Sequence, residues 1–429
     1  MTAVANTPAV QTHVTSPLVR MPWKTTIALG IFAVLAIILF IAFARGGKMG
    51  FEFSGGNGGL VIPPLSVAAI PSEIVIAIVA ALMAIASGLL TWRQIRTPFW
   101  FIAIFAVLLV AGFLIWSSAG NSTPFYLTAL LAGTVATSTP LIYGALGGVI
   151  SERVGVTNIA IEGQLLAGAF CSEIVATITK SPLAGLIAAV IAGVIVSFIL
   201  AAFTIKYWVN QVIVGVVLNS LVIGLTTFVY QEVLVNNTTG LNSFAALPSL
   251  PIPGLSLIPI LGPVVFSQNI IVYLMYIAVA AVTIGLFRTR WGLRLRSVGE
   301  HPQAADTVGI NVSRTRFWNV ALAGGLVGLG GAWFTLGNTG PFDANITSGA
   351  GYIALAAVIF GGWHPIRAMF AALLFGFCSY LQSAFSTSGS VVPNDFLLML
   401  PYIVTILAVA GFVGRVRGPA AAGKPYIKS

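Results

Sequence analysis

The sequence predicts an all-α polytopic membrane protein with about 10–12 transmembrane segments. Hydrophobic residues make up 58% of the 429 residues and charged residues only 7%, whereas a soluble domain carries about 25% charged residues. The mean hydropathy is +1.01. Apolar runs of roughly 20 residues, long enough to cross a bilayer as a helix, recur along the whole chain. Most of the surface must therefore face lipid, where only structures that pair their own backbone groups are stable.

Twelve apolar segments are candidate spans. In chain order they are 25–44, 73–92, 99–117, 124–150, 158–179, 182–205, 212–230, 270–287, 317–337, 350–362, 366–385 and 395–413. The 350–362 segment is too short to cross comfortably. Three alternatives are open for it: it forms a re-entrant hairpin with 366–385, it spans half of the membrane, or it is fused with its neighbour.

The distribution of Lys and Arg predicts the orientation, because cytoplasmic loops of membrane proteins carry an excess of both. With a cytoplasmic N-terminus, 17 of the 20 basic residues fall on the inner side. The three on the outer side are Arg45, Lys48 and Lys180. Both termini are therefore expected in the cytoplasm, and the net charge of +10 reflects anionic headgroups rather than nucleic acid.

A basic inner loop after the eighth span contains the signals of a short amphipathic helix. Pro302 suits the first helical position and Gly309 the position just past the end. Ala304, Ala305 and Val308 are expected on one face. Such a helix is suited to docking another protein; the alternative is a basic loop that lies on lipid headgroups.

Sequence motifs of enzymes are absent. The chain has no G-x-x-x-x-G-K-[ST] phosphate loop, G-x-S-x-G elbow, H-E-x-x-H or Cys-x-x-Cys motif. His13, His301 and His364 are too scattered to suggest a metal site, and Cys171 and Cys378 give no disulfide framework. We expect a protein that is not an enzyme, with no cofactor and no metal of its own.

Polar side chains recur at membrane depth in SERVGVTNIAIEGQLLAGAF, where an ionisable group costs at least ~2.5 kcal/mol. Four-residue spacing is expected to put Asn158 and Glu162 on one helix face, with Gln164 on another side. Thr157 and Asn158 are good N-cap residues, and a helix start favours a negative charge. Glu162 therefore either lines a protein-walled pathway or locks a helix start in place.

Further polar groups follow in VNQVIVGVVLNSLVIGLTTF. Asn210 and Gln211 are expected to cap the entry of a span, and Asn219 to be buried within it. The outer loop 231–269 is either a docking surface or lid, or an apolar loop on the membrane surface. Clustered glycines at 324–331 predict close helix contacts.

Several of these stretches resemble one family. SERVGVTNIAIEGQLLAGA resembles the signature of inner-membrane permease subunits of ABC importers, in the ribose and branched-chain amino acid permease superfamily. NIAIEG and VNQVIVGVVLNSL are similar to its nucleoside-importer branch. VGEHPQAADTVGINVSRTRF resembles the segment that couples to the ATPase, with His301 where Asn is common, and GYIALAAVIFGGWHPIRAMFAALLFG resembles the late re-entrant hairpin.

The resemblance covers roughly Pro124 to the C-terminus and implies a domain organisation. Residues 124–413 would be the importer permease core and 414–429 a cytoplasmic basic tail. Residues 1–123, with about three extra spans, would be an N-terminal extension without an assigned role.

The resemblance also implies a multi-subunit transporter and the partners of this chain in it. A separate ABC ATPase would supply ATP and Mg, and would contact the coupling segment formed by Glu300, His301, Pro302, Ala304, Ala305, Asp306, Val308 and Gly309. An extracytoplasmic substrate-binding lipoprotein and a second permease subunit, for nucleosides often a different chain, would complete it. The location would be a bacterial plasma (inner) membrane, and the mechanism alternating access.

The cargo implied by the resemblance is a nucleoside. We expect the substrate pathway to involve Tyr143, Asn158, Glu162, Gln164 and Asn219. A flat aromatic base needs a stacking ring and an amide, which Tyr143, Phe170, Asn158 and Gln164 offer. Three alternatives remain open: the same machine for a sugar such as ribose or for a branched-chain amino acid, a secondary transporter coupled to protons through Glu162, and a non-transporting scaffold.

Overall fold

The structure is a computed structural model that describes residues 23–53, 63–120, 124–388, 396, 399 and 418–427. Ten helices in this part of the chain are long and apolar enough to cross a membrane, which confirms the all-α polytopic class. The chain divides into two compact units. The first comprises residues up to Gly47 with Ala68–Ala119, and the second comprises Lys48–Val67 and residues from Gly120 onward.

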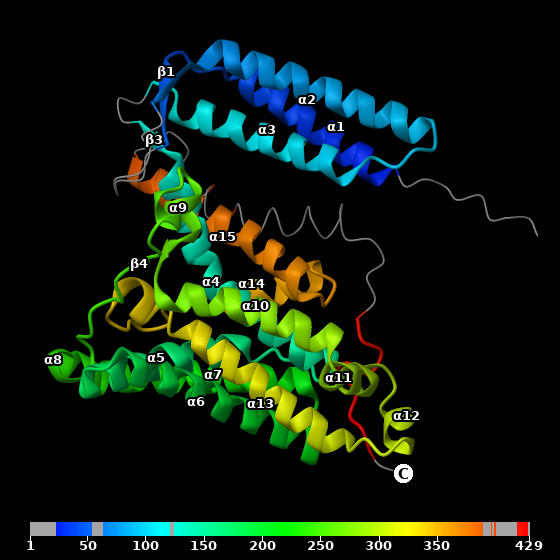
Figure 1. Cartoon of the computed structure of the whole chain (residues 1–429), viewed down its shortest axis with the longest axis vertical. Coiled ribbons are helices and arrows are strands. Elements are labelled where there is room, and N and C mark those ends of the chain that lie inside the picture. Colours follow the sequence, from blue (N-terminus) through cyan, green and yellow to red (C-terminus); the bar gives the residue numbers. More distant parts are fainter. Residues whose placement is uncertain are drawn as a thin grey trace, which may run out of the picture. The chain divides into compact units, whose positions relative to one another are not determined.

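The described part of the first unit is built from the helices labelled α1, α2 and α3 in Figure 1. They are α1 (Lys24–Ile37, continued as a π-helical turn to Ala42), α2 (Ala69–Trp92) and α3 (Phe99–Ser118). Their small core is formed by Leu29, Ala33, Ala80 and Phe105. Because the helices are apolar nearly all round, most of their surface is suited to lipid.

The described part of the second unit holds seven long helices. They are α4 (Leu127–Arg153), α5 (Ile161–Thr179), α6 (Pro182–Ala201), α7 (Gln211–Val229), α10 (Ile270–Arg288), α13 (Val312–Gly331) and α15 (Pro365–Ser388). Three of them continue into π-helical turns, Ala202–Lys206 after α6, Tyr230–Leu234 after α7 and Thr335–Thr339 after α13.

Shorter elements connect the long helices. The helices are α8 (Thr238–Leu241), α9 (Leu261–Val265), α11 (Arg290–Glu300), α12 (Pro302–Thr307) and α14 (Ala350–Phe360), with single 3-10 turns at Val235–Asn237 and Leu255–Leu257. The strands are β1 (Lys48–Glu52), β2 (Leu65–Ala68), β3 (Phe125–Tyr126), β4 (Leu250–Pro251) and β5 (Ser267–Gln268).

The boundary between the units differs from a simple cut at residue 123. Strand β1 pairs in parallel with β3, with Phe51 opposite Phe125, and the Thr128 hydroxyl donates to the Phe53 carbonyl at 2.8 Å. Residues 48–67 therefore belong with the second unit although they precede α2 and α3 in the chain. The three predicted extra spans form the first unit.

Glycines bring α5, α6 and α13 into close contact, side by side in Figure 1. A Cβ atom on Gly168 would lie 2.2 Å from the carbonyl oxygen of Gly328, and one on Gly193 2.1 Å from that of Gly324. Helices in lipid associate through such backbone approach, since apolar burial gives no net drive there. The predicted contacts of the glycines at 324–331 are confirmed.

The two uncertain spans have different outcomes. The 350–362 segment forms the separate helix α14, whose 11 residues are roughly 16 Å long and cannot cross a core of about 30 Å. A turn at 361–364 joins it to α15, so it is a separate helix and not fused with its neighbour. The re-entrant and half-spanning alternatives stay predictions. The 395–413 segment lies outside the described residues, Phe396 and Met399 excepted.

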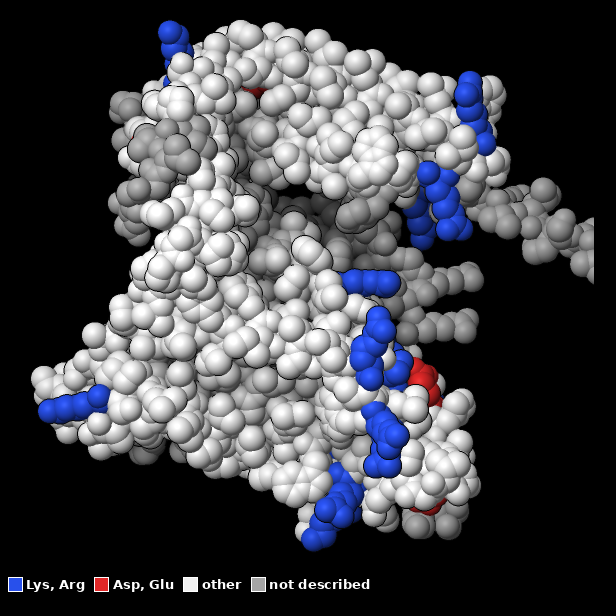
Figure 2. All heavy atoms as spheres, in the orientation of Figure 1, with Lys and Arg blue, Asp and Glu red and all other residues white. Residues whose placement is uncertain are grey.

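Most of the basic side chains visible on the second unit lie at the end of α11 and α12, a further one lies at the opposite end, and the flank of the spanning helices between them is uncharged (Figure 2). The structure therefore keeps the charge asymmetry on which the orientation was predicted.

Candidate functional site

The NIAIEG stretch lies at a break between two helices. Helix α4 ends at Arg153 and α5 begins at Ile161, with a non-helical connection in which Gly155 has a φ of +93°. Ile161 packs beside α4, because a Cβ on Gly144 would lie 3.2 Å from its Cγ2 atom. Gly144 precedes the end of α4 by nine residues, roughly 14 Å of helix. The start of α5 is therefore inside the bundle.

Glu162 holds the start of the half-length helix α14. Its Oε1 accepts hydrogen bonds from the Thr347 hydroxyl at 2.6 Å and the Gly349 N–H at 2.9 Å, and its Oε2 accepts from the Gly351 N–H at 2.6 Å. The side chain is 1% exposed. A helix start has unpaired N–H groups and a partial positive charge, both of which a carboxylate satisfies. These contacts match the locking alternative; a pathway role for Glu162 stays a prediction.

Asn158 and Gln164 form a separate buried amide pair. The Asn158 Nδ2 donates to Gln164 Oε1 at 3.0 Å, and Gln164 Nε2 donates to the Ser197 hydroxyl of α6 at 2.9 Å. All three side chains are fully buried. The pair therefore ties the connection before α5 to α5 itself and to α6.

Two expectations about Asn158 are wrong. Because α5 begins only at Ile161, Asn158 is outside the helix and shares no helix face with Glu162. The N-cap position is occupied by Ala160, without a side-chain cap, rather than by Thr157 or Asn158. Backbone hydrogen bonds from Val154 and Val156 to the end of α4 continue the turn there, and they delay the next helix.

One stripe of α7 braces this connection. Gln211, Gly215 and Asn219 are spaced by four residues and so lie on one helix face. Gln211 Oε1 accepts the Thr157 N–H at 2.7 Å, and a Cβ on Gly215 would lie 2.8 Å from that of Ile159. The two stretches that resemble nucleoside importers thus form one hydrogen-bonded unit.

Asn219 makes the most contacts in this stripe. Its Oδ1 accepts the Gly163 N–H at 2.8 Å, and its Nδ2 donates to the Ile159 carbonyl at 2.9 Å and to the Tyr352 hydroxyl at 3.1 Å. Its predicted burial is confirmed. Asn210 caps α7, as predicted, by accepting the Val212 N–H at 2.9 Å.

Tyr143 is fully buried in α4 and donates its hydroxyl hydrogen to the Ile271 carbonyl at 3.0 Å, which fixes the start of α10. The structure thus joins Glu162 and Asn219 around Gly163, pairs Asn158 with Gln164, and keeps Tyr143 apart. Sequence reasoning missed Ser197, Thr347 and Tyr352. The run TSGAGY, glycine-rich before an apolar segment, was the available signal for the last two.

The predicted coupling segment, residues 300–309, lies at the basic end and contains the short helix α12, preceded by the last residue of α11. Pro302 occupies the first turn of α12, and Gly309, with a φ of +84°, follows its end, as predicted. The prediction that Ala304, Ala305 and Val308 share one helix face is wrong. Ala305 is 3% exposed and packs into the core, whereas Val308 is 74% exposed and Ala304 is also exposed. With only six helical residues, the chain turns at Val308 and directs it outward.

The described part of the C-terminal tail packs against this segment. The Ala421 N–H donates to the Gly299 carbonyl at 2.9 Å, and Arg316 Nη1 donates to the Lys424 carbonyl at 3.0 Å. The side chains of Tyr426 and Asp306 also share a hydrogen bond. Residues 418–427 therefore belong structurally to the coupling end.

The turn at 361–364 lies at the same end. The Trp363 indole N–H donates to Glu152, and Arg153 Nε donates to the Trp363 carbonyl at 3.0 Å. His364 stacks on Phe287 with ring centroids 4.8 Å apart. Burial lowers the pKa of His364, and the nearby Arg367 and Arg153 lower it further.

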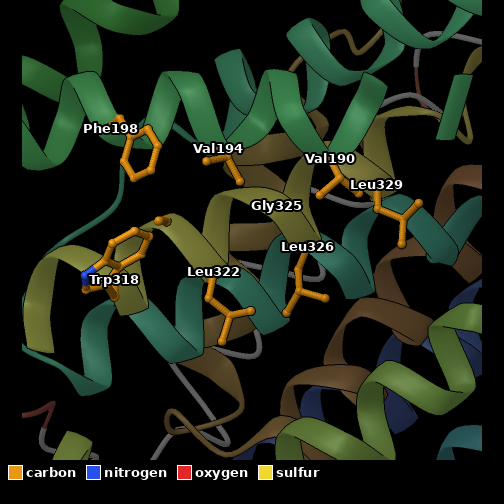
Figure 3. Close-up of a pocket in the computed structure, with 9 residues that line it drawn as sticks. Val190, Val194, Phe198, Trp318, Leu322, Gly325, Leu326 and Leu329 are labelled. Atoms are coloured by element: carbon orange, nitrogen blue, oxygen red, sulfur yellow. The ribbon is translucent and has the colours of Figure 1, made fainter. Parts of the chain in front are cut away.

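An open groove of about 450 Å³ runs between α6 and α13 (Figure 3). It is lined by Val190, Val194, Phe198, Trp318, Ala321, Leu322, Gly325, Leu326 and Leu329. Its lining is almost wholly apolar, so it suits lipid or an apolar helix and lacks the groups that recognise a polar solute.

The family described as branched-chain amino acid transport system / permease component matches residues 130–409. The guanosine ABC transporter permease protein NupQ of Bacillus subtilis is 42% identical over 319 residues, 70% of this chain and 97% of that protein.

Two further relatives differ in their named cargo. The nucleoside ABC transporter permease protein NupC of Lactococcus lactis is 38% identical over 70% of this chain and 97% of its own. A putative glucose ABC transporter permease protein of Haloferax volcanii is 35% identical over 65% and 85%. No solved structure matches the chain.

Proposed function

Because this chain belongs to the permease component family of branched-chain amino acid transport systems, we propose that it is the membrane-spanning subunit of an ABC importer for nucleosides. The observation that carries the cargo is the 42% and 38% identity to a guanosine and a nucleoside permease over nearly their whole lengths. The unit formed by NIAIEG and VNQVIVGVVLNSL supports it, since these stretches resemble that branch.

The energy would come from a separate ATPase that docks at the end formed by α11 and α12. The exposed Val308 and Ala304 offer an apolar contact there, and the surrounding arginines offer charge. Hydrolysis of ATP with Mg in the partner would move α12, and the packed tail and α13 would carry that motion into the bundle.

A second permease subunit would complete the pathway, because one chain of this kind exposes polar groups at membrane depth that need a facing wall. For a nucleoside importer we propose that this second subunit is a different chain and not another copy of this one. A substrate-binding lipoprotein would deliver the cargo to the opposite end, where the loop 231–269 lies. That loop is anchored rather than free: Glu173 accepts the Phe244 N–H at 2.8 Å, and Asn242 Nδ2 donates to the Phe342 carbonyl at 2.9 Å.

The location would be the plasma membrane of a bacterium, with both termini in the cytoplasm. The 17-to-3 division of basic residues and their grouping at the α11–α12 end support this orientation.

A sugar is the second candidate cargo, favoured by the 35% identity to a putative glucose permease. Uptake of radiolabelled guanosine by cells with and without this gene, with ribose, glucose and leucine as parallel cargoes, separates the candidates. We expect loss of guanosine uptake alone; loss of sugar or leucine uptake instead would overturn the nucleoside assignment.

ATP depletion and a proton uncoupler should be applied separately in the same cells. Uptake that stops on ATP depletion and survives the uncoupler is expected of an ATP-driven importer. The opposite result would identify a proton-coupled transporter.

A further inference from the structure

The chain between α13 and α14 crosses part of the bundle without regular structure. Residues 340–349 are non-helical, and Asn345, Ser348 and Gly349 have φ values of +54°, +43° and +85°. At one end Asp343 shares a hydrogen bond with Tyr230, which follows the last residue of α7. At the other end the segment reaches Glu162 and its neighbour Asn219.

The depth of this segment follows from α7. Asn219 precedes Tyr230 by 11 residues, so the two are roughly 16 Å apart along the helix. The segment contacts Tyr230 through Asp343, and Asn219 is bonded to Tyr352 just beyond it. It therefore descends about half the thickness of a bilayer core.

Polar groups on this segment are exposed. Asp343, Asn345 and Ser348 are exposed, and Tyr352, in the first turn of α14, is 48% exposed. Leu221 and Leu225, which are exposed at this depth of α7, are apolar and suited to lipid. Irregular backbone at membrane depth is tolerated where protein buries it or where it lines water, and not against lipid tails.

We propose that residues 341–349 and Tyr352 form one wall of the aqueous substrate pathway, where Tyr352, Asn345 and Ser348 recognise a nucleoside. The proposal rests on the proposed function. An aromatic ring stacks on any flat base, and an amide presents both a donor and acceptors to a base edge or a ribose hydroxyl. Asn219 orients the ring by donating to the Tyr352 hydroxyl at 3.1 Å.

The other candidate surfaces lack this chemistry. Tyr143, Asn158 and Gln164 are fully buried and bonded within the chain. The groove in Figure 3 is almost wholly apolar. In the described part of the second unit, the face formed by residues 341–349 and Tyr352 combines exposure, polarity and membrane depth.

Cysteine accessibility in the assembled transporter tests whether this wall faces water. The transporter is prepared in membrane vesicles with Cys171 and Cys378 replaced by alanine. In this background Asn345→Cys and Ser348→Cys should react with a charged, membrane-impermeant thiosulfonate in at least one of two conditions, with ATP or without it. Guanosine should slow the reaction severalfold. The control Leu225→Cys, at an exposed position of α7 among apolar side chains, should not react. Absence of labelling at both positions, as when the second subunit packs directly on this face, would overturn the proposal.

Substitution of Tyr352 tests recognition. Tyr352→Leu removes the ring and should raise the KM for guanosine on the order of tenfold, whereas Tyr352→Phe keeps the ring and should stay within about threefold. The matched control Phe228→Leu, on an exposed aromatic of α7, should change nothing. A fall in maximal rate with an unchanged KM for Tyr352→Leu would show a structural role and refute recognition. If the wild-type transporter imports sugar instead, the proposed function fails while the labelling experiment still decides the aqueous wall.

Discussion

Glu162 Oε2 lies 2.6 Å from the backbone nitrogen of Gly351, so a carboxylate of one helix caps the first turn of another 189 residues later in the chain. A half-length helix that begins inside a bundle has N–H groups that lipid cannot satisfy and that, on its buried side, need a protein acceptor. The carboxylate supplies both the acceptors and the favourable charge. This contact explains why a charged residue is buried in a chain that is otherwise so apolar.

Glu162→Gln should destabilise this contact while it keeps the side-chain shape. The variant loses the charge and turns an amide NH₂ toward N–H donors, which should cost about 2 kcal/mol. We expect a lower unfolding temperature of the purified transporter and reduced uptake. Glu232→Gln, on an exposed residue, is the control. Undiminished stability with abolished uptake would instead place the charge in the transport step.

Asn219→Leu should separate α7 from the connection before α5. It leaves the Gly163 N–H and the Ile159 carbonyl without partners in a buried site, each at a cost of about 1–3 kcal/mol. The neighbouring exposed Ser220→Ala serves as the control. Thermal unfolding of both variants is the measurement, and equal stability would contradict the bracing role.

Gly193→Ala and Gly224→Ala test helix packing as a matched pair. A methyl group on Gly193 would meet the Gly324 carbonyl at 2.1 Å, whereas around Gly224 nothing lies within 4 Å. Overpacking should cost about 1–3 kcal/mol at Gly193, while alanine at Gly224 should be neutral or stabilising by up to about 1 kcal/mol. The measurements are the yield of folded protein and its unfolding temperature for each variant. A less stable Gly224→Ala than Gly193→Ala would refute the close approach of α6 and α13.

Val308→Asp and Ala305→Asp should fail in different ways. Val308 is 74% exposed, so its substitution should leave the permease folded but weaken ATPase docking and reduce uptake by on the order of tenfold. Ala305 is buried, so a carboxylate there should lower folding itself. Copurification of the ATPase and thermal stability distinguish the two. Val235→Asp, exposed far from α12 in the chain, should affect neither; normal ATPase binding by Val308→Asp would refute the docking surface.

His364 should make stability sensitive to acid. Its folded-state pKa is lowered by burial and by Arg367 and Arg153, so the unfolded chain binds this proton more readily. The contribution of neutral His364 to the free energy of unfolding is therefore fully present above the ordinary pKa of about 6.5, and it is lost as the pH falls below that value. Unfolding temperatures at pH 7.5 and 5.5 should differ less for His364→Gln than for the wild type, and an identical difference would contradict this origin.

Much of the architecture was predictable from the sequence, because the length and apolarity of each span are encoded locally. Ten of the twelve predicted segments appear as long helices, and the caps Asn210, Pro302 and Gly309 are where residue type placed them. Each of these features depends on residues within one or two helical turns.

The partners of the polar residues depended on contacts between distant segments. The sequence alone could not show that Glu162 meets Gly351, or that Asn158 pairs with Gln164, since these contacts require the late start of α5. That Val308 is exposed while Ala305 is buried likewise follows from where α12 ends against the core. Apolar length is a local property that one segment determines, whereas a buried hydrogen bond needs two segments brought to the same point, and that is decided by tertiary packing.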